Sequence, residues 1–185
     1  YQKKARDLVA KARAVFQTAF NQHETAWKQY GTFIDRTKDE AKYDARAKSE
    51  VNMIRAQLDL ALCTYEEAQT YDIEAADFKR LLNEAAAKFE EMHQRYRSQV
   101  AGLFARLWQA KCFEEQGDLQ KALGIYNELL AHPGEDGAIS RLKDQTLQFK
   151  LISLNSKDRG DYQLVVDLGE EWLKKHAAEA RTRTG

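Results

Sequence analysis

The side chains that most often carry chemistry are scattered along this sequence. His23-Glu24 begins like the metal-binding helix of a zinc hydrolase, in which a second histidine follows four residues after the first. Trp27 occupies that position, so the second ligand is missing and Glu24 is expected to be a surface acid. The other histidines fall on separate segments, at His93, His132 and His176.

Acidic residues occur in adjacent pairs, which are Glu66-Glu67, Glu90-Glu91, Glu114-Glu115 and Glu170-Glu171. Adjacent residues on a helix point about 100° apart, so the two carboxylates of such a pair cannot easily form a catalytic dyad. The sequence also contains no glycine-rich phosphate loop, no nucleophile elbow and no Cys-x-x-Cys motif. We therefore expect a protein that is not an enzyme and that holds no cofactor and no metal.

The two cysteines, Cys63 and Cys112, lack metal-type spacing and lie in helical, mostly apolar contexts. Buried thiols are the favoured interpretation, ahead of a disulfide or a reactive thiol. The redox compartment stays open on this evidence.

Composition favours a helical chain that is soluble in water. Of 185 residues, 43% are hydrophobic and 31% are charged, with one proline and nine glycines. The 29 basic and 29 acidic residues balance, which argues against a nucleic-acid partner because such binding needs a basic field. No apolar run approaches the roughly 20 residues of a membrane span. We expect one all-α domain over residues 1–185, as a fragment of a longer repeat protein.

Apolar residues recur at three- and four-residue steps, which predicts seven helices and no strand. Ser98 is expected to cap the fourth helix, and His132-Pro133-Gly134 to end the fifth. Gly31 offers an alternative, earlier end for the first helix, and residues 178–185 are expected to form a tail. The predicted helices cover about residues 2–34, 44–70, 74–96, 99–116, 119–132, 138–156 and 162–176.

Two Gly-Asp dipeptides, Gly117-Asp118 and Gly160-Asp161, separate amphipathic helical stretches. Glycine can take the left-handed conformation that ends one helix, and aspartate can cap the next. A repeated helix–turn–helix unit cannot bury its apolar faces alone and must stack on neighbours. Proteins built in this way usually bind other proteins.

Residues 99 to about 176 resemble two tetratricopeptide repeats (TPR). The residues that match the family pattern are Ala110, Phe113, Gly117, Asp118, Ala122, Tyr126 and Pro133 in the first copy, and Ser153, Gly160, Asp161 and Tyr162 in the second. Ser156 and Val165 depart from the usual aromatic and alanine, and the turns are 43 residues apart instead of 34. The resemblance implies repeats at 99–136 and 137–177, a degenerate pair at 44–98, and a long N-terminal helix and loop at 1–43.

The family resemblance further implies antiparallel helical hairpins stacked as an α-solenoid, whose concave groove receives a peptide or a helix. The candidate groove residues are Phe104, Leu107, Lys111, Glu114, Leu147, Lys150, Leu154 and Lys157. Lys111 and Lys150 are expected to be exposed and to present positive charge to the ligand. The alternative is that the four apolar members are simply core. Leu107, Lys111 and Leu154 also replace the residues of a clamp for chaperone tails, so such a tail is not the expected partner.

The leading functional hypothesis is therefore a scaffold that binds a partner protein or peptide. The alternative is a structural module that forms a homo-oligomer through the N-terminal helix or an open solenoid end. A small-molecule or nucleic-acid sensor is a third class, without positive support in the sequence. At the C-terminal end, Leu168, Trp172 and Leu173 span too wide an arc to face the sixth helix together.

Overall fold

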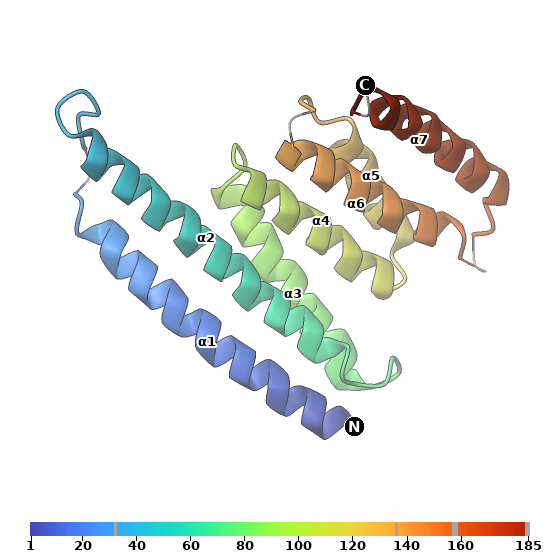
Figure 1. Cartoon of the computed structure of the whole chain (residues 1–185). Helices are drawn as coiled ribbons and strands as arrows, with labels where there is room; N and C mark the ends of the chain where they lie inside the picture. The colour runs from blue at the N-terminus through green and yellow to red at the C-terminus, as the bar shows by residue number, and fades with distance from the viewer. Residues whose placement is uncertain (32, 136, 157–158, 184–185) are drawn as a thin grey trace.

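The computed structural model describes residues 1–31, 33–135, 137–156 and 159–183, with side chains of the last helix described to Ala177. Over these residues the chain forms seven α-helices and no strand (Figure 1), which confirms the all-α prediction. The helices are α1 (Gln2–Lys28), α2 (Glu40–Ala68), α3 (Ala76–Arg95), α4 (Val100–Glu115), α5 (Leu119–Leu130), α6 (Gly137–Leu154) and α7 (Tyr162–Arg183). Among the described residues, no helix is both long and apolar enough to cross a membrane.

Several helix boundaries differ from the sequence prediction, and α2 begins at Glu40 instead of near residue 44. α1 ends at Lys28, close to Gly31 with its φ of 69°, so the earlier end was the correct alternative. Ser98 does not cap α4, because the helix starts one residue later with Gln99 in the cap position and without a side-chain cap bond. At the other end of the chain, α7 continues as helix to Arg183, past the predicted end near residue 176.

Both Gly-Asp turns adopt the predicted backbone. Gly117 and Gly160 have φ values of 85° and 66°, the left-handed region in which a Cβ is costly. After the first turn, the Asp118 carboxylate accepts a hydrogen bond from the Lys121 backbone N–H at 3.3 Å. The Asp118 backbone N–H donates to the Phe113 carbonyl at 2.9 Å, which satisfies an orphan carbonyl at the end of α4.

Contacts between helices follow chain order, and each helix packs against the next. α2 also contacts α4, and α4 contacts α6, whereas α1, α3, α5 and α7 make no such contacts with one another over the described ranges. We call α2, α4 and α6 the even layer (Figure 1). The two terminal helices differ from the rest, because α1 contacts α2 alone and α7 contacts α6 alone within the described chain.

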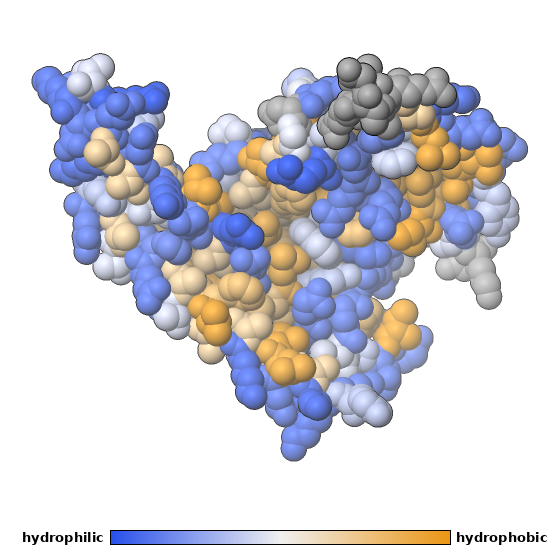
Figure 2. Space-filling model, viewed as in Figure 1, coloured by the Kyte–Doolittle hydropathy of each residue, from blue (hydrophilic) through white to orange (hydrophobic). Residues whose placement is uncertain are grey.

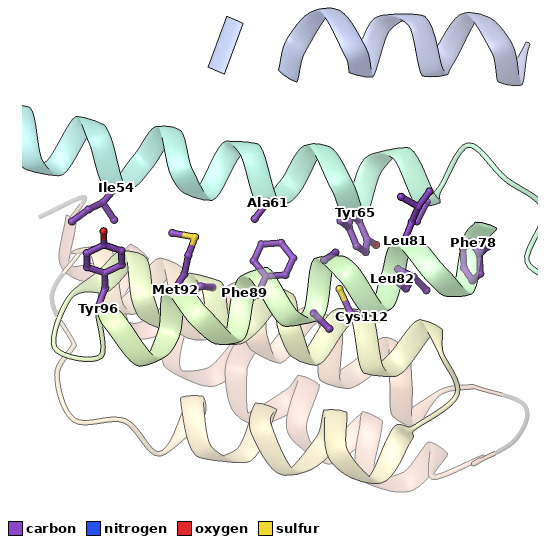
Figure 3. Packing of buried hydrophobic residues seen from close by; sticks show 14 of the residues in the cluster. Ile54, Ala61, Tyr65, Phe78, Leu81, Leu82, Phe89, Met92, Tyr96 and Cys112 are labelled. Atoms are coloured by element: carbon purple, nitrogen blue, oxygen red, sulfur yellow. The ribbon is translucent and has the colours of Figure 1, made fainter. Parts of the chain in front are cut away.

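Two hydrophobic clusters hold this arrangement together. The first lies where α2 meets α3, and Figure 3 shows Ile54 of α2 opposite Tyr96 at the end of α3, and Tyr65 of α2 near Phe89 of α3. The second joins α4, α5 and α6 and includes Leu107, Tyr126 and Leu142. No α1 side chain is fully buried, although the whole helix is described. α1 therefore lies against the first cluster through half-buried residues such as Phe20 and Trp27.

The cysteine prediction is confirmed, because both thiols are free and buried. Cys112 is enclosed where α4 meets α3, and burial raises the pKa of its thiol to about 12. Burial likewise raises the pKa of the Cys63 thiol on α2. Both sulfurs therefore carry protons at neutral pH and act as small apolar core atoms.

A close backbone approach fixes where α4 starts relative to α3. An ideal Cβ added to Gly102 would lie 2.1 Å from the carbonyl oxygen of Tyr96, so no larger residue fits without a backbone shift. The buried His93 ring also donates from Nδ1 to the Gly102 carbonyl at 3.1 Å. These contacts set the position of α4, and hence the position of the side chains that α4 contributes to the even layer.

We expect Gly160→Val to destabilise the protein and Gly124→Ala to leave it equal or more stable. Valine at a φ of 66° is strained, whereas a Cβ at Gly124 meets no atom within 4 Å. Alanine also has a helix propensity better than that of glycine by about 1 kcal/mol. Urea unfolding of both variants measures the difference, and equal or reversed shifts would contradict the assigned turn.

Candidate functional site

The even layer presents one continuous open surface, which we call the even face. Three- and four-residue steps place its members on one stripe of each helix, and all of them are exposed or half-buried. The even face comprises Val51, Arg55, Leu58, Leu62 and Glu66 of α2 with its C-cap Gln69, then Phe104, Trp108, Lys111 and Glu115 of α4, then Arg141, Gln145, Gln148 and Ile152 of α6.

A row of aromatic rings joins the three helices beneath this surface. The Trp108 ring of α4 lies between Tyr65 of α2, at a centroid distance of 5.1 Å, and Phe149 of α6, at 5.6 Å. The second contact is edge-to-face, an arrangement that aromatic rings favour. Tyr126 of α5 extends the row, with its ring centroid 6.4 Å from that of Phe149. The half-buried Trp108 is therefore held in place by both of its neighbours.

A polar network surrounds these rings. The Tyr65 hydroxyl donates to Glu115 at 2.5 Å, and the Tyr126 hydroxyl donates to Glu114 at 2.6 Å. Lys111 Nζ lies 2.6 Å from a Glu114 oxygen and 3.5 Å from a Glu115 oxygen. The Gln69 side-chain amide also donates to Glu115. The Glu114 and Glu115 carboxylates therefore share one ammonium group and accept three further hydrogen bonds from neutral donors.

The network leaves an excess of negative charge near α2. Burial raises the pKa of Tyr65 and Tyr126, and their bonds to carboxylates raise it further, so both phenols remain neutral donors. Burial also raises the pKa of Glu66 on the even face, and the nearby charge of Glu115 adds to this shift. Since Lys111 compensates one carboxylate and not two, the surface between α2 and α4 favours a cationic group.

The acidic groups of this network are engaged by neighbouring side chains. Within the described ranges, no three histidine, cysteine or acidic side chains lie close enough together to hold a metal ion. The carboxylates that approach one another, Glu114 and Glu115, are both occupied by Lys111 and by tyrosine hydroxyls. Aromatic anchors with a charged surround are typical of surfaces that recognise another protein.

The structure separates the predicted groove residues into several groups. Phe104 and Lys111 lie on the even face, whereas Leu107 and Leu154 are 0% and 2% exposed and belong to the second cluster. The core alternative therefore holds for these two leucines. Leu147 is not on the even face and lines a groove between α6 and α7, whose lining also includes Arg141, Gln145 and Gln148 of the even face. Lys157 lies outside the described residues.

The charged members of the prediction are less exposed than expected. The side chains of Lys111 and Glu114 are 15% and 9% exposed, because they pair with each other beneath the surface. Lys150 is spaced four residues from Thr146 and from Leu154, both buried, and burial lowers the pKa of its ammonium group. The expectation that both lysines are exposed is therefore wrong, because Lys111 is largely covered and Lys150 is half-buried.

Sequence reasoning missed Trp108, Glu115 and the open stripe of α6. On α4 the predicted stripe was displaced by part of a turn, so Leu107 and Glu114 were chosen instead of their neighbours. On α6 the predicted side packs toward α7, and the open side carries Arg141 and Ile152. The run of polar residues at Arg141, Gln145 and Gln148 was the available signal for an exposed α6 face.

No family model, curated protein or solved structure matches the chain. Function must therefore be inferred from the contacts, burial and charges of the even face.

We expect Lys111→Glu to destabilise the protein by about 3 kcal/mol, because it replaces the shared ammonium group with a third carboxylate. Carboxylates that are crowded together in a folded protein have raised pKa values. The destabilisation that they cause is therefore present at high pH and falls as the pH drops through those values. Urea unfolding should therefore show a larger deficit at pH 7.5 than at pH 5. Lys79→Glu on exposed α3 surface is the control, with an expected change within about 0.5 kcal/mol. A Lys111→Glu protein as stable as this control would contradict the proposed role of Lys111.

Proposed function

We propose that the chain is a TPR-like α-solenoid that acts as a non-enzymatic scaffold for protein interaction. The order of contacts supports this architecture, since α2/α3, α4/α5 and α6/α7 are consecutive pairs and the first helices of the pairs contact one another. In the TPR-like arrangement the first helix of each pair lines the concave side. The even face then corresponds to the partner-binding side, and a peptide or helix of the partner crosses α2, α4 and α6.

The observation that carries the proposal is the aromatic row from Tyr65 through Trp108 to Phe149. It gives the even face a rigid centre, since each ring is restrained by its neighbour and needs little ordering when a ligand binds. Exposed Val51 and Ile152 supply apolar contacts on the helices to either side. Half-buried Trp108, supported from beneath by the other rings and surrounded by apolar and charged side chains, is a favourable place for a few side chains to supply most of the binding energy.

Charge favours a partner segment with basic residues. A cationic side chain placed between Glu66 and Glu115 would offset the negative charge that raises the pKa of Glu66. An acidic segment would meet repulsion at the same place. We therefore propose a partner peptide that combines aliphatic or aromatic residues with at least one lysine or arginine.

The test is selection of random peptides on the immobilised protein, followed by fluorescence anisotropy with the enriched sequences. Enriched peptides should combine apolar and basic residues, and Val51→Glu and Ile152→Glu should each weaken binding about tenfold, or about 1.4 kcal/mol. Ile73→Glu is the matched control, because Ile73 is as exposed as Val51 but lies in the turn between α2 and α3. Peptides that bind all three variants equally well would show that the even face is not the binding site.

A further inference from the structure

The C-terminal end of the molecule has an open groove against which one more helix can pack. A groove of about 550 Å³ lies between α6 and α7, and its lining includes Gln148 and Leu151 of α6 with Gly169 and Trp172 of α7. α6 itself contacts both α4 and α5, and α4 contacts both α2 and α3. The groove on α6 and α7 is therefore the place that an additional helix of the even layer would occupy.

The Gly-Asp turns allow α7 to be compared with α5 position by position. Aligning the turns pairs Leu119, Leu123, Tyr126 and Leu130 of α5 with Tyr162, Val166, Gly169 and Leu173 of α7. On α5, Leu123 and Tyr126 are 8% and 0% exposed within the cluster that α6 completes. On α7, Val166 and Leu173 are 52% and 61% exposed. An apolar stripe that is covered on α5 is thus uncovered on α7, and Leu173 does not face α6 with Leu168 and Trp172.

Gly169 shapes the middle of this stripe. It stands where α5 has Tyr126, and a Cβ built on it meets no atom within 4 Å. The missing side chain leaves a hollow that a bulky residue of an incoming helix can fill. Apolar surface is visible over α7 in the space-filling view (Figure 2).

The opposite end of the chain offers a helix of the required kind. α1 contacts α2 alone among the described helices. Tyr1, which precedes α1, and Leu8 and Val15 on α1 recur at seven-residue spacing, and Tyr1 and Leu8 line an open hollow with Glu66 and Gln69 of α2. Leu8 and Val15 are 58% and 66% exposed. Seven-residue spacing keeps side chains on one stripe of a helix, which is the pattern of a helix that packs along another. α1 therefore has a second apolar stripe in addition to the one that faces α2.

The charges of the two ends are complementary. On α1, Lys3, Lys4 and Lys11 are exposed and form no ion pair within the described part of the chain. Along α7 and the residue before it, the acidic residues Asp161, Asp167, Glu170 and Glu171 outnumber Lys174 and Lys175 between Asp161 and Ala177, although Glu170 pairs with Lys174 and Arg141 of α6 also lines the groove. Opposite charges on two such helices favour the encounter of α1 with α7 over the pairing of α7 with a second α7.

We propose that α1 of a second copy packs its Leu8 and Val15 side chains into the groove between α6 and α7, so that copies associate head to tail. Each contact of this kind leaves one free α1 and one free α7 groove, so the protein forms chains, or rings where the rotation closes. The groove shares Arg141, Gln145 and Gln148 with the even face, so a bound copy covers the α6 end of that face, but the association does not require a ligand there.

Sedimentation velocity over a range of protein concentrations tests the proposal. The wild-type protein should form species larger than a dimer as concentration rises, and added salt should weaken the association. Leu8→Asp blocks α1 and Leu173→Asp blocks the groove, so each variant alone should be monomeric. An equimolar mixture should restore a one-to-one dimer, because each variant retains the surface that the other lacks.

Matched controls separate this contact from nonspecific effects. Leu164→Asp is also on α7, but Leu164 lies two residues from Tyr162 and from Val166 and so on the opposite side of the helix. Ala14→Asp serves in the same way on α1, and both controls should associate like the wild type. Circular dichroism melts should show all four variants folded.

Three results would overturn the proposal. A wild-type protein that stays monomeric at every concentration would show that no copy fills the groove. Leu8→Asp protein that still associates would exclude α1 as the occupant. A mixture of the two blocked variants that remains monomeric, although the wild type associates, would indicate a symmetric contact instead. None of these results depends on Val51 or Ile152, so the peptide-binding proposal is tested separately.

Discussion

Each interior helix of this protein carries apolar side chains on more than one side and therefore needs more than one neighbour. An amphipathic helix with a single stripe is satisfied by one contact surface. Here α4 buries Ala105 and Cys112 in the first cluster and Leu107 and Ala110 in the second. This requirement explains why the helices follow one another in a row, and why the even layer exists at all. It also explains why the two terminal helices keep uncovered apolar residues.

The polar network also fixes the register of α4 against α2 and α5. Tyr65 on α2 binds Glu115 on α4, and Tyr126 on α5 binds Glu114 on the same helix. Adjacent residues of α4 thus hold partners on two different sides, with Lys111 between the two carboxylates. A slide of α4 by one turn would separate both tyrosines from their acceptors and leave buried charge without a partner. Apolar contacts alone tolerate such a slide more readily, so the network favours one arrangement.

Local sequence determined much of the fold, but the choice of surface residues required tertiary information. Helix periodicity and the residues Gly117 and Gly160 predicted the seven helices and both turns, because these features depend on neighbours in sequence. Trp108 and Glu115 could not be separated from Leu107 and Glu114 in this way. All four lie on a helix with several neighbours, and the side that stays open depends on where those neighbours cross it. The burial of Lys111 similarly depends on Phe149, which lies 38 positions away and 5.3 Å from its ammonium nitrogen.

The attachment of α1 to α2 alone has a consequence for the native-state dynamics of the chain. Its anchors are half-buried residues such as Phe20 and Trp27, together with Arg13, which pairs with Glu67 at 2.5 Å. Detaching α1 breaks its interface with α2, which is the most extensive helix interface in the described chain, and the bond from Arg6 to the Thr70 carbonyl. Because α1 contacts no other helix of the described chain, it can open without disturbing α3 to α7. We therefore expect its amide protons to exchange with solvent at a lower free energy than that of global unfolding.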